Sequence, residues 1–173
     1  MGFMSVDSQY DILTSRIEEI LPKKEFMYKL EKSVKNNIPL NIKLGCDPSR
    51  PDLHIGHSVV LNKLKQFQDL GHNIILVIGD FTAMIGDPTG RNKTRPQIDL
   101  KETKENSKTY ISQVSKILNI KKTKIVYNSK WLNEINFNKL IKLSSKFTLA
   151  QFLERDDFSK RYNSVLPISL HEF

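Results

Sequence analysis

The stretch DPSRPDLHIGHSVVLNKL, residues 47–64, places two of the chain's four histidines, His54 and His57, three residues apart with Gly56 between them. They stand where a turn-rich loop gives way to a helical pattern. A helix start carries partial positive charge and unpaired N–H groups, and two imidazoles there can donate to phosphate oxygens. Gly56 would let a bulky ligand approach the backbone. Histidines that only cap the helix give the same pattern, so both interpretations stay open.

A zinc site is another interpretation of these histidines. It needs a third ligand, for which His72 and Cys46 are available, but neither stands at a recognised metal-ligand spacing. We therefore expect no tightly bound metal. Cys46 is the only cysteine, which suits a reducing compartment, and we expect it to be a small core residue rather than a nucleophile.

Other phosphate-binding and hydrolytic motifs fit poorly. GDPTGRNKT, residues 86–94, lacks the glycine-lysine-hydroxyl ending of a phosphate-binding loop. The glycines at 79, 86 and 90 do not have the dinucleotide-binding spacing, and no serine stands in a nucleophile-elbow context. The sequence gives no positive support to covalent hydrolysis.

The elements around the histidines predict a strand-helix-strand unit. Residues 40–46 alternate in polarity as a strand does, 57–70 form a helical pattern that ends at Gly71, and 73–79 are apolar enough for a strand buried on both faces. Such crossovers are parallel and right-handed, and ligands gather at the carboxyl ends of the strands. Both histidines lie at that edge, as does the long loop 80–99. The apolar side of the helix comprises Val60, Leu61, Leu64, Phe67 and Leu70.

The rest of the chain continues an α/β layout. We expect a Rossmann-like parallel sheet with flanking helices, an incomplete nucleotide-binding fold with N-terminal helices and a helical connective segment. The further elements expected are two helices within 7–36 divided near Pro22, a helix at 101–118, a strand near 124–127 and helices through 137–162. The expected divisions are an N-terminal helical segment at 1–37, a nucleotide-binding half at 38–128 and a connective segment at 129–173.

Composition indicates a soluble globular protein with an uneven charge. Residues 1–91 carry 11 basic and 11 acidic side chains, whereas 92–173 carry 16 and 8, so the net charge of +8 lies in the second half. This excess of positive charge is typical of a protein that binds a polyanion. It also fits a drift in the composition of the whole proteome, because lysine outnumbers arginine 21 to 6. The longest apolar run, IILVI at 74–78, is too short to span a membrane, and no secretory signal is recognisable.

The histidine motif is one of several motifs that follow one another along the chain. LGCDPSRPDLHIGH, followed after one helix and one strand by GDFTAMIGDPTGRNKTR, resembles the nucleotide-binding half of the tyrosyl-tRNA synthetases, within the class I aminoacyl-tRNA synthetases. The likeness is greatest to bacterial members and runs from about residue 38 to the end of the chain, through SKFTLAQFLERDDFSKRY and PISLHEF. Tryptophanyl relatives usually carry a different histidine motif.

The resemblance implies roles for individual positions. His54 and His57 match residues that hold ATP and steady its phosphates, with the Ser49 hydroxyl beside them. Arg91 and Arg95 match basic residues on a loop that closes over pyrophosphate, although a plain surface loop is an alternative for them. The positions that line ATP or the adenylate are Gly45, Asp47, Pro48, His54, Gly56 and His57, and those at the tyrosine are Gly45, Asp47, Thr82 and Asp87.

The implied reaction activates tyrosine with ATP, with Mg²⁺ as counter-ion, to tyrosyl-adenylate and transfers the tyrosyl group to tRNA(Tyr). A carboxylate is already a nucleophile, so the enzyme supplies alignment and charge stabilisation. The resemblance also implies a cytoplasmic homodimer without membrane contact, paired through 129–165. A tryptophanyl-type enzyme, another HxGH nucleotidyltransferase and a non-catalytic RNA-binding module stay as alternatives.

The chain departs from the family in two respects. Lys43 stands where many members carry a tyrosine that contacts the substrate hydroxyl, and we expect it to point out of its strand. Family members continue well beyond PISLHEF, so we expect an N-terminal portion that is inactive alone. Arg155, Lys160 and Arg161 are interpreted as a solvated helix face rather than tRNA contacts.

Overall fold

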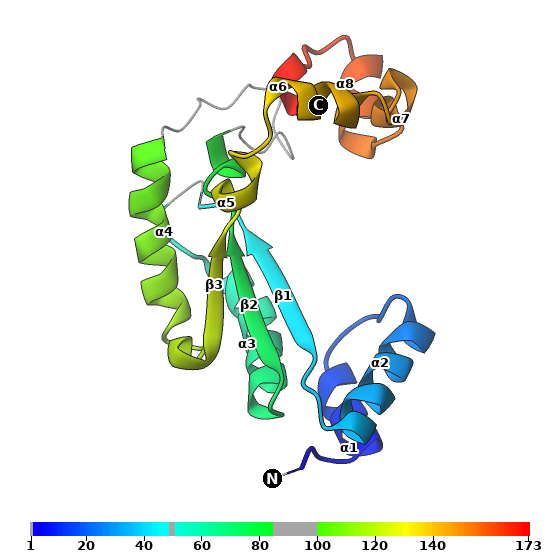
Figure 1. Ribbon diagram of the computed structural model, residues 1–173, viewed down its shortest axis with the longest axis vertical. Helices are drawn as coiled ribbons and strands as arrows, with labels where there is room; N and C mark the ends of the chain where they lie inside the picture. The colour runs from blue at the N-terminus through cyan, green and yellow to red at the C-terminus, as the bar shows by residue number, and fades with distance from the viewer. Residues whose placement is uncertain (1, 49–50, 85–99) are drawn as a thin grey trace.

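The computed structural model describes residues 2–48, 51–84 and 100–173. Three strands lie at its centre, with helices α1 (Val6–Thr14) and α2 (Lys23–Asn36) at one end and a group of short helices at the other (Figure 1). Within the described ranges, no helix is both long and apolar enough to cross a membrane.

The sheet is parallel throughout, in the order β1-β2-β3. Strand β1 (Asn41–Cys46) pairs with β2 (Asn73–Ile78), and β2 pairs with β3 (Thr123–Tyr127). The register sets Gly45 opposite Val77, so the strands end together at one edge. The predicted α/β, Rossmann-like parallel sheet is confirmed.

Helices α3 (Ile55–Asp69) and α4 (Leu100–Val114) supply the crossovers, and both pack on the same face of the sheet. Ile75 and Val77 point to the opposite face and are only half-buried, so the prediction that 73–79 is buried on both faces is wrong. The buried core comprises Leu61, Leu64, Ile74, Leu76, Ile78, Val114 and Leu118.

The end of α3 matches the glycine expected there. Gly71 has a φ of +91°, in the left-handed region that favours glycine. The Gly71 N–H donates to Gln68 O (3.1 Å) and the His72 N–H to Phe67 O (3.0 Å), which satisfies the last carbonyls of the helix.

The N-terminal helices are fastened to the strand-helix-strand unit by polar contacts. The Lys63 ammonium on α3 donates to the carbonyls of Leu13 (3.0 Å) and Ser15 (2.9 Å) at the end of α1. His72 accepts the Leu40 N–H at Nδ1 (3.1 Å), and its Nε2 lies 2.9 Å from Gln9 Oε1. Residues before β1 are thereby fixed against both α3 and the start of β2.

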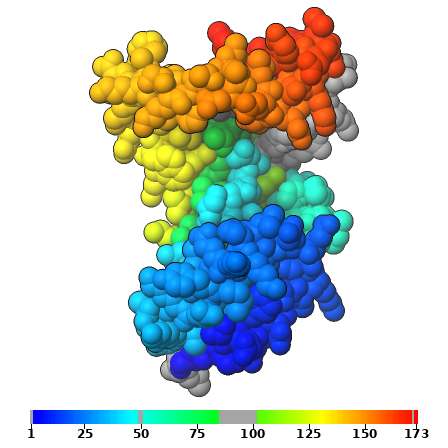
Figure 2. All heavy atoms as spheres, turned by 90° about the vertical axis from the view of Figure 1, so that its right-hand side faces the viewer, coloured from blue at the N-terminus to red at the C-terminus, as the bar shows by residue number. Residues whose placement is uncertain are grey.

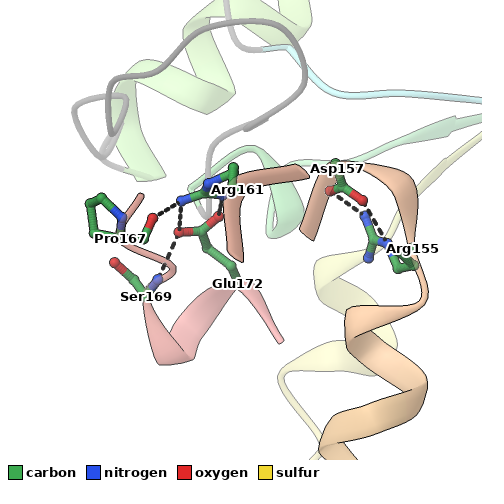
Figure 3. A network of polar contacts seen from close by, with 6 residues as sticks. All are labelled: Arg155, Asp157, Arg161, Pro167, Ser169 and Glu172. Atoms are coloured by element: carbon green, nitrogen blue, oxygen red, sulfur yellow. Dashed lines mark hydrogen bonds and ion pairs between the residues drawn. The ribbon is translucent and has the colours of Figure 1, made fainter. Parts of the chain in front are cut away.

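The C-terminal helices form the other end of the molecule, as Figure 2 shows in orange and red above the blue N-terminal helices. Arg161 forms a two-pronged ion pair with Glu172 and also donates to Pro167 O (Figure 3). Its side chain is only 17% exposed, so the expected solvated face is wrong for this residue. These helices are α5 (Ser129–Leu132), α6 (Phe137–Ser144), α7 (Leu149–Leu153) and α8 (Asp156–Asn163).

Candidate active site at the carboxyl edge of the sheet

His54 and His57 form a reciprocal cap at the start of α3. The Gly56 N–H donates to His54 Nδ1 (3.1 Å), and the His54 N–H donates to His57 Nδ1 (3.2 Å). The two rings are 4.0 Å apart between centroids. The helix begins at Ile55, two residues before the predicted start, because the first imidazole replaces the usual hydroxyl or carboxylate cap.

This cap fixes the proton on each neutral ring. A backbone N–H can only donate, so Nδ1 of both imidazoles must be an unprotonated acceptor, and the ring proton sits on Nε2. His54 is exposed and His57 half-buried. The two interpretations of the pair are therefore compatible, since one nitrogen of each ring caps the helix and the other is a hydrogen-bond donor.

The cap changes which groups can bind an anion. The N–H groups of Gly56 and His57 are already bonded, the latter to His54 O at 2.9 Å, so they are not the unpaired donors that the helix start predicts. Gly56 also has a role that the sequence did not predict. A Cβ there would lie 2.9 Å from His54 Cε1, so the glycine makes room for the histidine ring.

Side chains of α4 hold the loop that carries these histidines. Gln113 accepts the Leu53 N–H (2.9 Å) and donates to Pro51 O (2.9 Å), while Thr109 also donates to Pro51 O. One turn earlier, the buried Asn106 amide donates to the carbonyl of Pro48, itself buried (3.2 Å). These α4 residues fall on one helix face, so a single helix holds the loop at two points, Pro48 and residues 51–53.

The loops after β1 and β2 meet at Asp47. The Thr82 hydroxyl donates to Asp47 Oδ1 at 2.8 Å. Gly79 lies beneath this contact, and a Cβ there would fall 1.7 Å from Asp47 Oδ1 and 2.5 Å from Thr82 Oγ1. Only glycine leaves room for both side chains.

A cavity of about 360 Å³ opens beside these groups. Its polar lining includes Asp47, His54 and His57, and its apolar lining includes Tyr110 and Val114 from α4. Gly45 also lines it, and a Cβ on that glycine would meet only Lys43 Nζ, at 3.9 Å. Lys43 is exposed, as expected, on the same side of β1 as Gly45.

Cys46 and His72 take no part in a common metal site. Burial, and secondarily Asp47, raises the pKa of the Cys46 thiol to about 11, so it is a poor nucleophile at neutral pH. His72 precedes β2 and Cys46 ends the parallel strand β1, so the two lie at opposite ends of the strands.

Most residues of the predicted site lie close together in the described part of the chain. Gly45, Asp47, Gly56 and both histidines line one cavity, and Thr82 joins them through Asp47. The predicted residues Ser49, Asp87, Arg91 and Arg95 lie outside the described residues. Sequence reasoning missed Gly79, Asn106 and Gln113, whose roles depend on contacts between distant segments.

Comparison with known proteins is consistent with this geometry. The chain is 59% identical over 173 residues to tyrosine–tRNA ligase of Chlorobaculum tepidum and 54% identical over 173 residues to that of Salinibacter ruber. Both alignments cover 100% of this chain but only 43% and 42% of the relatives. The chain therefore spans less than half the length of these curated relatives.

Solved structures share the fold at low sequence identity. A C-terminally truncated mitochondrial tyrosyl-tRNA synthetase from Aspergillus nidulans superposes with a TM-score of 0.75 at 22% identity, over 96% of this chain and 49% of that one. The model of the class I tRNA synthetases (W and Y) matches residues 35–173. Because that match covers most of the chain, the chain belongs to the class I tRNA synthetase family of the tryptophan and tyrosine enzymes.

Proposed function

We propose that this chain is the nucleotide-binding part of a tyrosine–tRNA ligase, which activates tyrosine with ATP and transfers it to tRNA(Tyr). The observation that carries the proposal is the meeting of two crossover loops, in which Asp47 accepts the Thr82 hydroxyl beside the His54–His57 cap. Relatives at 54–59% identity bear that name.

The paired imidazoles suit the first step. A carboxylate oxygen of tyrosine attacks the α-phosphorus of ATP, the bond to pyrophosphate breaks, and charge shifts among the phosphate oxygens. The Nε2–H groups of His54 and His57 donate to those oxygens, and one such donor is worth about 100- to 1,000-fold in rate. Mg²⁺ enters as the counter-ion of the ATP phosphates.

Asp47 and Gly45 suit the amino-acid end of the site. A fixed carboxylate pairs with an ammonium or a hydroxyl of the substrate, and the bond from Thr82 restricts its rotation. Ser49, Asp87, Arg91 and Arg95 complete the proposed site on the basis of the family motif alone. Pro48 contributes by its buried place in the loop, where Asn106 holds its carbonyl.

The test is ATP–pyrophosphate exchange by the complete protein that contains this chain. We expect exchange with tyrosine and none with tryptophan. Exchange with tryptophan would assign the sister activity, and nucleotidyl transfer without any amino acid would assign another HxGH enzyme. Salt-dependent tRNA binding without exchange would identify an RNA-binding module.

The connective segment supplies the proposed dimer surface. No residue of α6 is buried, and its Phe137 and Ile141 are 75% and 53% exposed. An apolar helix face of this kind indicates an interface. Other large apolar side chains exposed in this segment are Trp131, Ile135, Leu140, Leu143, Phe147 and Leu149.

Sedimentation of the complete protein tests this surface. Phe137→Asp with Ile141→Asp should convert a dimer to a monomer, whereas Lys142→Ala on the same helix should not. A monomeric wild type, or a double variant that stays dimeric, would contradict the proposed surface.

We also propose that 1–37, 38–128 and 129–173 act as helical segment, nucleotide-binding half and connective segment. A cytoplasmic location, where tRNA charging serves translation, agrees with the single, half-buried thiol.

A further inference from the structure

A run of hydrogen bonds joins the ends of all three strands at the proposed site. Asn128 follows β3 directly, and its side chain is buried, with the residue 7% exposed. Its Oδ1 accepts the Phe81 N–H (2.9 Å), and its Nδ2 donates to Thr82 Oγ1 (2.9 Å). Thr82 in turn donates to Asp47 Oδ1 (2.8 Å) at the end of β1.

The direction of these bonds is fixed at both ends. The Phe81 N–H can only donate, which sets the amide oxygen of Asn128 toward it and the NH₂ group toward Thr82. A carboxylate only accepts, so the single hydroxyl proton of Thr82 points to Asp47 rather than to Gly79 O, which lies at 3.4 Å.

We propose that Asn128 is a positioning residue of the adenylate site, which orients the Thr82 hydroxyl and thereby holds the Asp47 carboxylate for the substrate. This inference rests on the proposed function and adds to it a residue from the third strand. Asn128 acts through Thr82.

The attachment of β3 to β2 does not need the Asn128 amide group. Asp80 accepts both the N–H (3.0 Å) and the hydroxyl (2.6 Å) of Ser129, and the Asn128 backbone N–H donates to Ile78 O (2.9 Å). These contacts fasten the strand ends independently. The NH₂ group of Asn128 is therefore assigned to the site rather than to the sheet.

Asn128→Asp tests the direction of the bonds with almost no change in shape. The new carboxylate still accepts the Phe81 N–H, but its second oxygen competes with Asp47 for the Thr82 proton. Thr82→Val removes the hydroxyl that transmits this effect, and Thr82→Ser keeps it. Asn119→Asp, at the exposed N-cap of the short 3-10 helix Ile120–Lys122 before β3, is the matched asparagine control.

The measurement is kcat/KM for tyrosine in pyrophosphate exchange by the complete protein, with thermal unfolding of each variant. Asn128→Asp should lower kcat/KM about tenfold in the wild-type and Thr82→Ser backgrounds, and less than about twofold in Thr82→Val. Asn119→Asp should change neither reading.

Equal losses in all three backgrounds, or no loss in the wild type, would overturn the inference while leaving the proposed function intact. A wild type without tyrosine-dependent exchange would overturn both. If Asn128→Asp unfolds, Asn128→Ala in the same three backgrounds decides. It removes both the donor to Thr82 and the acceptor of the Phe81 N–H. Because the second loss is common to all backgrounds, a larger loss in the wild-type and Thr82→Ser backgrounds than in Thr82→Val supports the inference, and equal losses overturn it.

Discussion

Replacing His54 by asparagine separates the capping role of the imidazole from its role as a donor. His54 Nδ1 accepts the Gly56 N–H at 3.1 Å, a bond that the side-chain oxygen of asparagine makes equally well. Asparagine has no group that takes the place of Nε2–H on the far side of the ring. His54→Ala loses both functions.

The two variants should therefore differ in stability and agree in activity. Loss of an N-cap costs about 1 kcal/mol, so His54→Ala should unfold at lower temperature than His54→Asn, which should match the wild type. Loss of one donor to a charged transition state lowers the rate about 100- to 1,000-fold, so both variants should be slow.

The assay pairs tyrosine-dependent pyrophosphate exchange with thermal unfolding in the complete protein. Asn62→Ala, about two turns along the same helix and exposed, is the control and should change the exchange rate little. Exchange by His54→Asn at the wild-type rate would refute the donor role. Equal stability of His54→Ala and His54→Asn would refute the cap.

Three further changes follow from local geometry. Val165 lies two residues after the end of α8, with a φ of 54°, and is 92% exposed. Val165→Gly should therefore raise the free energy of unfolding by up to about 1 kcal/mol, and a lower unfolding midpoint would contradict the strain. Burial lowers the pKa of His72 from 6.5, so at mildly acidic pH the unfolded chain binds more protons than the folded one. The free energy of unfolding should therefore fall as the pH drops below about 6.5. His72→Gln should flatten this pH dependence in urea titrations, and an unchanged dependence would contradict the role of His72. Gly79→Ala should displace Asp47 and slow exchange at least tenfold, whereas a normal rate would show that the contact with Thr82 is dispensable.

Local patterns predicted the elements because each carries its own signal. The alternation at 40–46, the apolar run at 73–79 and Gly71 correspond to β1, β2 and the end of α3. The second face of β2 was predicted wrongly, because a continuous apolar run does not show on which side the crossover helices pack. Ile75 and Val77 are half-buried for that reason.

The site was predictable where a motif is local and obscure where contacts are distant. The spacing of His54 and His57 marked the helix start, but not that each ring caps it through Nδ1. Asn106 and Gln113 form hydrogen bonds with a loop some sixty residues earlier in the chain. Asn128 bonds to Thr82, which lies 46 residues before it. No sequence spacing reports such pairings, since they arise only when the strands align.

The central claim is that the loops after β1 and β2 form one site for an activated amino acid. A crystal structure of the complete protein with a non-hydrolysable tyrosyl-adenylate analogue tests it most directly. We expect the analogue to contact both Asp47 and the His54–His57 pair in one cavity, with the Thr82 bond to Asp47 intact. An analogue bound elsewhere, or one that reaches only one of the two loops, would contradict the account.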